Sequence, residues 1–348
     1  MGAPMRVGPM RVGVVGYGLF GRLHARSIGK APDAVLTAIC AQGDDSASAA
    51  AADHPGVRLY RDYRQLCTAP DIDMVCVVTP NHLHADVTVA ALAGGKHVLL
   101  EKPMANDLAD CERILGAERA SGRRVSIGHE LRVSSQWSAI KRLLDEGAIG
   151  RPYYANYSLF RHPYRPGAAG WRHDQARVGS WILEEPVHFF DLLMWYFAGW
   201  GDPRSVRAHG VSLNGRPGMY DSFSCHLAFA GPEYVTITQA LGGFEHHVVL
   251  EIAGSEGALR SVWSGAGART LQPSFELKIK RKGAAEAERV ELAMSGEVFD
   301  LEEEIRQTVA AFRRGEALVG AAESRKRVMV CLEAERSVAE NREIALQF

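Results

Sequence analysis

The sequence has 348 residues, of which 47% are hydrophobic and 23% are charged, so it is long enough for two domains with sizeable cores. Lysine and arginine number 40 against 41 aspartates and glutamates, which gives a net charge of −1 without any prominent basic tract. This balance argues against nucleic acid as a partner. No run of about 20 apolar residues is present, so we expect no membrane span.

The six cysteines are scattered along the chain, and no two of them form a Cys-x-x-Cys pair. We expect buried, reduced thiols of a cytoplasmic protein, and neither a disulfide framework nor a metal site. Residues 1–9 contain no apolar segment of the kind found in a secretory signal, and the folded chain is expected to start near Met10.

The N-terminal part alternates short apolar runs with helical patterns. This alternation is typical of βαβ units and predicts an α/β domain, a doubly wound parallel sheet over residues 10–128. The apolar runs are 11–15, 35–40, 74–79, 97–101 and 124–127, and the helical patterns are 21–30, 46–53, 84–94 and 107–121.

The first apolar run leads directly into a glycine-rich turn, Gly16-Tyr17-Gly18-Leu19-Phe20-Gly21, which has the pattern G-x-G-x-x-G. Gly16 would allow a tight turn, Gly18 the close approach of a pyrophosphate, and Gly21 close packing of helix on strand. The phosphates would then lie at a helix N-terminus, where free N–H groups and the helix dipole favour an anion. A surface turn is the alternative, but the buried-strand pattern before Gly16 disfavours it. All six residues are therefore candidates for binding a dinucleotide.

The end of the second apolar run bears on the choice of cofactor. An NAD site takes an acidic side chain about 20 residues after the glycines, for the ribose hydroxyls. Ala41 and Gln42 occupy that place, and Asp44 and Asp45 follow slightly later. No arginine stands in this turn to meet a 2′-phosphate, so NAD is slightly favoured while NADP stays open.

A polar loop follows the run at 74–79, with the sequence Thr79-Pro80-Asn81-His82-Leu83-His84. Ligands of doubly wound sheets bind at the carboxyl ends of the strands, where this loop is expected. The pair Pro-Asn is also common in ordinary turns. We interpret the loop as facing the cofactor, through Thr79, Pro80, Asn81 and His84.

The next apolar run ends in Glu101-Lys102-Pro103. A lysine at the end of a buried parallel strand is costly unless it has a function or a partner. Beside a nicotinamide, the ammonium group of Lys102 could bind a substrate hydroxyl and relay its proton, with Glu101 close to the cofactor. The alternative is a solvated charge at a strand exit.

Strand-like runs follow one another closely after residue 150, which predicts a second, α+β domain over residues 129–348 with a large, open, mostly antiparallel sheet. Gly231-Pro232 marks a hairpin between two of the runs. An open sheet needs a cover for its second face, so we expect a homodimer or homotetramer formed through it. The runs are 153–160, 205–211, 221–229, 234–241, 247–253, 258–263, 275–281 and 289–293, and helical patterns cover 180–197, 299–314 and 322–340.

A cluster of ionisable residues lies within the helical pattern at 180–197. Glu184 precedes His188 by four residues and Asp191 follows it by three, so on one helix the three would share a face. A carboxylate beside an imidazole suits a general acid or base. A core histidine on an amphipathic helix is an equally good interpretation, and no Cys/His cluster supports a metal site.

A polar stretch rich in glycine and proline precedes this helix and contains Arg161-His162 and Trp171-Arg172-His173. Such a loop could line a pocket for a polyol or an acid, with Arg161, His162, Trp171 and Arg172 as candidate substrate-binding residues. It could equally be a solvated connection, and the sequence does not decide between the two.

Together these motifs resemble the Gfo/Idh/MocA family of NAD(P)-dependent sugar and cyclitol oxidoreductases. The resemblance covers residues 10–348. It is carried by the motifs at 16–21, 79–84 and 101–103, by Gly147-Ala148-Ile149-Gly150, and by Glu251-Ile252-Ala253-Gly254-Ser255-Glu256-Gly257.

The resemblance implies a Rossmann domain and a C-terminal α/β domain whose open sheet forms dimers or tetramers. It also implies hydride transfer between a nicotinamide and a hydroxyl-bearing carbon, with Lys102 binding the hydroxyl and His188 as the acid or base. The family usually has Asp-x-Gly-x-His at this place, whereas Glu184 and Pro186 replace the aspartate and the glycine here. Either Glu184 or Glu185 is then expected to orient His188.

Three other functions are alternatives to this dehydrogenase activity. One is a glycosidase that uses bound NAD for transient oxidation, which would cleave a glycoside without accumulating reduced cofactor. Another is a non-catalytic regulator that senses a dinucleotide, which the retained Lys102 and His188 disfavour. A reductase of the trans-dihydrodiol or biliverdin type is less attractive, because the loop from Arg161 to His173 is polar.

Overall fold

The computed structural model describes residues 8–213 and 215–348, and the chain divides into two compact units. The first unit comprises Met1–His129, Ala176–Gly179 and Leu301–Val328, and the second comprises Glu130–Gln175, Ser180–Asp300 and Met329–Phe348. The first strand begins at Met10, as expected. The interpretation of residues 1–9 as lacking a secretory signal falls mostly outside the described residues.

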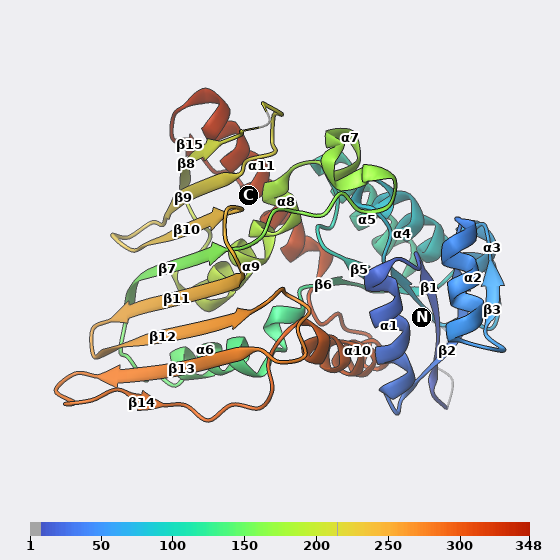
Figure 1. Ribbon diagram of the computed structural model, residues 1–348, viewed down its shortest axis with the longest axis horizontal. Coiled ribbons are helices and arrows are strands. Elements are labelled where there is room, and N and C mark those ends of the chain that lie inside the picture. The colour runs from blue at the N-terminus through green and yellow to red at the C-terminus, as the bar shows by residue number, and fades with distance from the viewer. Residues whose placement is uncertain (1–7, 214) are drawn as a thin grey trace. The chain divides into compact units, whose positions relative to one another are not determined.

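The first unit is built on a six-stranded sheet with the order β3-β2-β1-β4-β5-β6, in which every pair of neighbours is parallel (Figure 1). This confirms the predicted doubly wound sheet. The chain reverses its direction of winding between β1 and β4, and ligands of such sheets bind at this point. The strands are β1 (Met10–Val15), β2 (Ala34–Cys40), β3 (Arg58–Tyr60), β4 (Met74–Val77), β5 (His97–Glu101) and β6 (Val125–Gly128). The helices that connect them are α1 (Leu19–Lys30), α2 (Asp44–Asp53), α3 (Tyr63–Thr68), α4 (His84–Ala93) and α5 (Leu108–Ser121).

The core of this unit includes a helix from far along the chain. Val12, Val14 and Leu99 of the sheet pack in one buried cluster with three side chains of α10 (Glu297–Arg313), namely Ile305, Val309 and Phe312. The β-branched residues of β1 suit a strand that is buried on both faces. Helix α10 therefore contributes apolar area to the first unit, although it follows most of the second unit in the sequence.

The second unit contains a nine-stranded sheet with the order β14-β13-β12-β11-β7-β10-β9-β8-β15. The pair β7–β10 is parallel and the remaining pairs are antiparallel, which confirms a mostly antiparallel sheet. The hairpin expected at Gly231-Pro232 joins β9 and β10. The strands are β7 (Pro152–Phe160), β8 (Ser205–Val211), β9 (Ser222–Ala228), β10 (Tyr234–Ala240), β11 (His246–Gly254), β12 (Gly257–Gly265), β13 (Ser274–Arg281), β14 (Glu288–Arg289) and β15 (Ile344–Ala345).

The prediction of a strand at 289–293 is wrong for most of its length. Only Glu288–Arg289 forms, as an edge strand, and Val290 adds one backbone hydrogen bond to Leu277. The residues at 288, 289 and 291 are exposed, so burial adds little to hold a longer strand.

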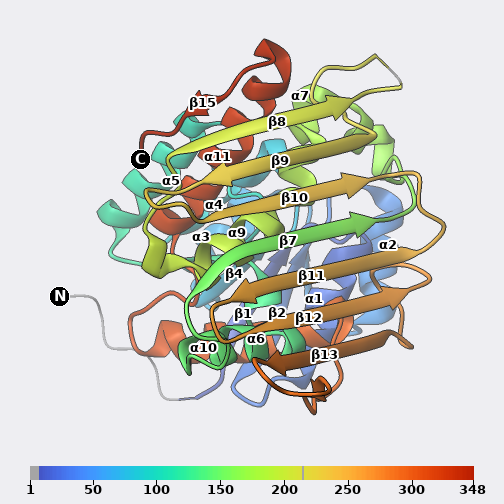
Figure 2. The ribbon, with the colours of Figure 1, turned by 90° about the vertical axis from the view of Figure 1, so that its left-hand side faces the viewer.

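The nine-stranded sheet has two different faces. Along β7 the buried side chains alternate with partly exposed ones, so that Ala155, Tyr157 and Leu159 point to one face and Asn156 and Ser158 to the other. Helices α6 (Ser135–Asp145) and α9 (Pro186–Tyr196) contact the sheet through β13 and β10. Figure 2 shows the opposite face of the sheet turned toward the viewer, with its strands uncovered. The sheet is therefore open on one face, as predicted, and the alternation of buried and partly exposed residues agrees with this.

The helical pattern at 180–197 forms two helices and not one. Helix α8 (Trp181–Glu184) ends at Glu185, whose φ of −128° and ψ of −52° are not helical, and α9 begins at Pro186. Proline lacks the N–H that a continuous helix needs but fits the first position of a new one. Glu184 and His188 therefore lie on different helices, and the argument that they share one helix face is wrong.

The longest helix is α11 (Ala321–Glu340), and its composition is strongly charged. Among the residues that the structure describes, no helix combines the length and the apolar character needed to cross a bilayer. All six cysteines are buried free thiols, as expected.

Candidate functional site

The three glycines of the turn after β1 have different surroundings. Gly16 has a φ of +98°, and a side-chain carbon there would lie 2.3 Å from the carbonyl oxygen of Val78. A side-chain carbon at Gly21 would lie 2.0 Å from the carbonyl oxygen of Gly16. At Gly18, which precedes α1, such a carbon would meet no atom of the described residues within 4 Å. Packing of the protein thus requires Gly16 and Gly21, whereas Gly18 leaves open space at the start of α1, as a bound pyrophosphate needs.

The other residues of the turn differ in their contacts. The hydroxyl of Tyr17 donates to Asp53 at 2.9 Å, and burial together with Asp53 raises the pKa of this phenol to about 12. The ring of Phe20 meets His24 edge-on at 5.1 Å, and Leu19 is 66% exposed. Tyr17 is therefore left to contribute to a ligand through its backbone.

An arginine that follows β3 lies at the end of β2. Ala41 is buried, and its N–H donates to the carbonyl of Tyr60 at 3.0 Å. Arg61, just after β3, donates to the carbonyl of Gln42 at 2.9 Å and pairs with Asp44 at 2.9 Å. The sequence prediction considered only the turn after β2 and missed Arg61, which the pairing of β2 with β3 brings there. Its presence removes the reason for favouring NAD over NADP.

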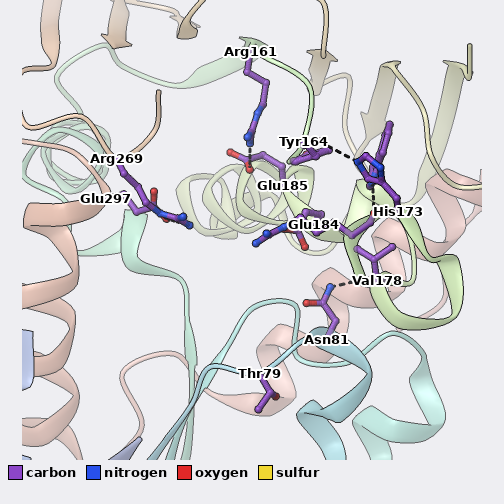
Figure 3. Close-up of polar contacts among 12 residues, drawn as sticks. Thr79, Asn81, Arg161, Tyr164, His173, Val178, Glu184, Glu185, Arg269 and Glu297 are labelled. Carbon is purple, nitrogen blue, oxygen red and sulfur yellow. Dashed lines mark hydrogen bonds and ion pairs between the residues drawn. The ribbon is translucent and has the colours of Figure 1, made fainter. Parts of the chain in front are cut away.

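The loop after β4 is held by its own polar side chains. The ring of His84 lies between two carbonyl oxygens, with Nδ1 at 2.7 Å from Pro103 and Nε2 at 3.0 Å from Thr79. Asn81 donates from Nδ2 to the carbonyl of Val178 at 3.0 Å (Figure 3). The Oγ1 atom of Thr79 is buried and has no hydrogen-bond partner among the described residues. Thr79 thus offers a hydroxyl to a ligand, while Asn81 and His84 shape the backbone that carries it.

The end of β5 is organised around a buried carboxylate. Oε1 of Glu101 lies 2.7 Å from Nε2 of His24 on α1, and Oε2 accepts from the backbone N–H of Lys102 at 3.3 Å. A side-chain carbon at Gly128 would lie 3.1 Å from Oε1, so this glycine makes room for the carboxylate. The peptide bond between Lys102 and Pro103 is cis. Glu101 therefore holds the backbone at Lys102 and, through His24, links the end of β5 to α1. The sequence around His24 gives no sign of this contact.

In the second unit, His188 lies beside a carboxylate that the sequence did not point to. Nε2 of His188 is 3.8 Å from Oε1 of Glu130, and both side chains are buried. The imidazole comes from α9 and the carboxylate from the short helix at Glu130–Arg132, 58 positions earlier in the chain. Asp191, also expected near His188, pairs with both arms of the Arg132 guanidinium at 2.7 and 2.5 Å.

Glu184 and Glu185, at the break between α8 and α9, each bind an arginine. Nε of Arg172 donates to Glu184 at 2.6 Å, and Nη1 of Arg161 donates to Glu185 at 2.6 Å (Figure 3). Burial by itself would lower the pKa of Arg161, but Glu185 and other nearby acids outweigh it and raise that pKa. Arg161 therefore stays charged although it is largely buried.

Residues 161–173, between β7 and α8, are held by contacts within the second unit. The guanidinium of Arg172 stacks 4.4 Å above the ring of Trp171, and the carbonyl of Arg172 accepts from the indole N–H of Trp181 at 2.9 Å. His162 is exposed, and its carbonyl accepts from Nε of Arg161 at 3.2 Å. Arg161 and Arg172 thus bind two adjacent glutamates, Glu185 and Glu184.

Comparison with known proteins connects both units to one family. Residues 10–129 match the model of an oxidoreductase family with an NAD-binding Rossmann fold, and residues 137–260 match the Gfo/Idh/MocA C-terminal domain. Inositol 2-dehydrogenase 4 of Saccharopolyspora erythraea is 30% identical over 282 residues, which cover 77% of this chain and 81% of that protein. The chain belongs to the Gfo/Idh/MocA family. It is accordingly an NAD(P)-dependent oxidoreductase acting on CH–OH groups.

Other relatives of this family match over a shorter stretch. Inositol 2-dehydrogenase of Salmonella typhimurium is 32% identical over 189 residues, 53% of this chain and 54% of that protein. The 1,5-anhydro-D-fructose reductase of Ensifer adhaerens is 33% identical over 199 residues, 56% of this chain and 58% of that protein. The chain thus spans little more than half of these two relatives.

Solved structures share the fold of this Gfo/Idh/MocA protein. An oxidoreductase domain protein from Kribbella flavida superposes with a TM-score of 0.86 at 20% identity, covering 98% of this chain and 100% of that one. Levoglucosan dehydrogenase in complex with NADH superposes with a TM-score of 0.84 at 20% identity, covering 97% and 99% of the two chains. At this identity, the likeness concerns the fold alone.

The residues of the first unit fit the dinucleotide that the family binds. The open space at Gly18 and the unpartnered hydroxyl of Thr79 both lie at carboxyl ends of strands, where such a ligand is expected. Within residues 8–213 and 215–348, no group of three or more His, Cys, Asp or Glu side chains is arranged to hold a metal ion.

Proposed function

We propose that the protein transfers a hydride between a nicotinamide dinucleotide and a hydroxyl-bearing carbon of a sugar, cyclitol or glycoside. The observation that carries this proposal is the pairing of open space at Gly18 with a free hydroxyl at Thr79, in a unit where the next strand of the sheet presents Lys102. The names of the relatives, inositol 2-dehydrogenase and 1,5-anhydro-D-fructose reductase, support the class of substrate.

The proposed proton chemistry uses Lys102 and His188. The ammonium group of Lys102 binds the reacting hydroxyl and takes part in relaying its proton. The imidazole of His188 accepts that proton when the substrate is oxidised and returns it when a ketone is reduced. Glu130, 3.8 Å from Nε2 of His188, stabilises the positive charge that the ring acquires. The bound nicotinamide supplies the hydride acceptor or donor.

We propose that the cofactor lies along the residues identified in the first unit. Gly16 to Gly21 would surround its diphosphate, Ala41 and Gln42 its adenosine ribose, and Thr79, Pro80 and Glu101 its nicotinamide half, with Asn81 and His84 supporting the loop. Both NAD and NADP fit this arrangement, because the ribose position lacks an acidic side chain at Gln42 but has Arg61 close by.

We further propose a homodimer or homotetramer formed through the uncovered face of the nine-stranded sheet. The rings of Tyr234 and Tyr154 lie 5.0 Å apart there at an angle of 48°, and Tyr154 hydrogen bonds to Thr236 at 3.2 Å. Tyr234 remains 43% exposed and Phe160 48% exposed, and both would be covered by a second copy. A cytoplasmic location fits the six buried free thiols.

The proposed function is tested by following the absorbance of the reduced nicotinamide. The purified protein is mixed with NAD⁺ or NADP⁺ and with inositols, free sugars, sugar acids and glycosides, while release of any aglycone is measured in parallel. The proposal expects absorbance to grow with at least one sugar or cyclitol. Aglycone release without net reduction would instead indicate a glycosidase, and silence across the panel with intact cofactor binding would indicate a regulator.

A further inference from the structure

Three arginine–glutamate pairs gather in the second unit around the break that precedes α9. Arg161 pairs with Glu185, Arg172 with Glu184, and Arg269 with Glu297 at 3.2 Å. Glu184 and Glu297 raise the pKa of Arg161 together with its own partner Glu185, so a carboxylate of each of the other two pairs acts on Arg161. Figure 3 shows the Arg269–Glu297 pair pointing toward Glu184 and Glu185. The pairs therefore form one charged group, which we call the paired cluster.

The paired cluster has no excess of positive charge to offer an anion. Its three guanidiniums are matched by three carboxylates, and Glu130 beside His188 adds a fourth, so the set carries one net negative charge while His188 is neutral. Two further groups nearby are uncharged at neutral pH. Burial lowers the pKa of His246 to about 4, and burial raises the pKa of Tyr164 well above its ordinary value.

The same groups are well suited to bind neutral hydroxyls. A guanidinium has five N–H donors in a fixed plane, and each carboxylate has two acceptor oxygens, so one pair presents donors and acceptors side by side. The hydroxyl of Tyr164 donates to Gln239 at 3.2 Å and adds an uncharged polar pair. A hydroxyl both donates and accepts, and therefore can satisfy either partner of a pair without separating the two charges. A carboxylate or phosphate can only accept, and its approach to an arginine would face the glutamate already bound there.

From this geometry we propose that the paired cluster is the substrate-recognition surface, and that it selects uncharged polyhydroxylated substrates while excluding analogues that carry a carboxylate or a phosphate. The inference rests on the proposed function and narrows its substrate class. In this proposal Glu184 and Glu185 contribute to substrate specificity. Glu184 neutralises Arg172, and Glu185 neutralises Arg161.

The test compares matched neutral and anionic ligands. Initial rates of cofactor reduction are measured with D-glucose against D-glucuronate, with D-galactose against D-galacturonate, and with myo-inositol against an inositol monophosphate. Binding of the same six compounds to the protein loaded with reduced cofactor is measured by calorimetry, which does not depend on turnover. We expect kcat/KM or affinity to favour the neutral member by about 100-fold, because placing like charges together is costly.

The decisive variant is Glu185→Gln, which keeps the shape of the side chain and leaves Arg161 without its charged partner. It should narrow the preference for the neutral ligand to about tenfold or less, since Arg161 then becomes available to an anion. Glu184→Gln should act in the same direction through Arg172. The control is Glu146→Gln, which removes a carboxylate from the exposed Arg142–Glu146 pair on α6 and should leave the preference unchanged. Binding of the cofactor by all three variants shows that they are folded.

The outcomes separate this inference from the proposed function. Net cofactor reduction with comparable rates for neutral and anionic ligands would support the oxidoreductase function but overturn selection by the paired cluster. A preference that Glu185→Gln and Glu184→Gln leave as large as in the wild type would overturn it as well. If none of the six compounds is turned over or bound, both proposals are contradicted.

Discussion

His188 depends on side chains that lie far from it in the sequence. The carboxylate near its ring is Glu130, from a short helix that precedes the sheet of the second unit, whereas Glu184 and Glu185 bind arginines. A buried imidazole gains most from a carboxylate when it is protonated, because the pair then exchanges an isolated charge for an ion pair. Glu130 is therefore a positioning residue that adjusts how readily His188 takes a proton.

Replacing Glu130 by glutamine should change the pH dependence of the reaction more than its fold. Oxidation needs the neutral form of His188, and loss of the carboxylate disfavours the protonated form. The rise of kcat/KM with pH should therefore move to lower pH in Glu130→Gln. Glu130→Asp should restore part of the wild-type profile, and an unchanged profile in both variants would show that Glu130 does not act through His188.

We expect the chemistry of the first unit to depend on Lys102. Lys102→Ala should lower kcat/KM by about 100-fold or more, the range in which a positioned proton donor or acceptor contributes. Binding of the reduced cofactor, measured by its fluorescence, should change little. Lys30→Ala, which removes an exposed lysine of the same unit, serves as the control. Unchanged turnover in Lys102→Ala would show that the assignment of this residue is wrong.

We expect Arg61 to influence whether the unit binds the 2′-phosphate of NADP⁺. If it faces the ribose, Arg61→Ala should weaken NADP⁺ binding by about tenfold or more, the loss expected for one charge-assisted hydrogen bond, and leave NAD⁺ binding nearly unchanged. Arg58→Ala removes a neighbouring arginine that pairs with Asp71 and provides the control. Dissociation constants that change in parallel for both cofactors would place Arg61 away from the phosphate.

At the scale of elements, the glycines of the turn between β1 and α1 meet two requirements, close packing of the backbone and open space for a ligand. Gly16 and Gly21 are enclosed by backbone atoms, whereas Gly18 faces open space. The motif predicts different roles for the three glycines, and the structure identifies the backbone oxygens that enclose Gly16 and Gly21.

Substitution of these glycines by alanine should therefore have opposite effects. Gly18 has a φ of −80°, which alanine adopts readily, so Gly18→Ala should leave the free energy of unfolding within about 0.5 kcal/mol of the wild type while weakening cofactor binding. Gly21→Ala should lower the free energy of unfolding by about 1–3 kcal/mol or more, because its side chain would meet a backbone oxygen. Denaturant unfolding and cofactor titration measure the two effects, and equal loss of stability in both variants would contradict this division.

Periodicity predicted most elements of both sheets, and it failed where elements are short or interrupted. β3 and α3, with three and six residues, are too short for a recognisable apolar period. The break at Glu185 had a local signal in Pro186, but the apolar stripe on both sides of it favoured one continuous helix. The parallel pairing of β7 with β10 depends on contacts between strands distant in the sequence, which no local pattern encodes.

At the scale of the whole molecule, the sequence predicted the motifs but not the distant residues that contact them. The glycine turn and the Glu101-Lys102 pair are contiguous in sequence and carry their chemistry with them. His24, Arg61 and Glu130 meet their partners only through tertiary packing. Helix α10 joins the core of the first unit after all but the last strand of the second sheet. A single sequence contains no local signal for such long-range neighbours.

Acid sensitivity should appear in both units because each buries a neutral histidine. Burial lowers the pKa of His97 in the first unit and of His246 in the second to about 4. Since an unfolded histidine titrates near 6.5, the folded state binds fewer protons than the unfolded state between these values. Stability is therefore fully present above about pH 6.5 and falls by a few kcal/mol per histidine as the pH approaches 4.

The measurement is the melting temperature between pH 7 and pH 4.5. His97→Gln should show a smaller fall over this interval than the wild type, whatever its stability at pH 7. Replacement of the exposed His162 by glutamine should leave the fall unchanged. An identical pH dependence in the wild type and His97→Gln would contradict a neutral, buried His97.

The central claim, transfer of a hydride from a hydroxyl-bearing carbon to the nicotinamide, is tested most directly by isotope transfer. Inositol and glucose deuterated on their carbon atoms are incubated with the protein and the oxidised cofactor, and the reduced cofactor is examined by mass spectrometry. The account predicts one deuterium on the nicotinamide ring of the reduced cofactor, and its loss in Lys102→Ala and His188→Ala. Substrate turnover without net deuterium on the cofactor would contradict a dehydrogenase.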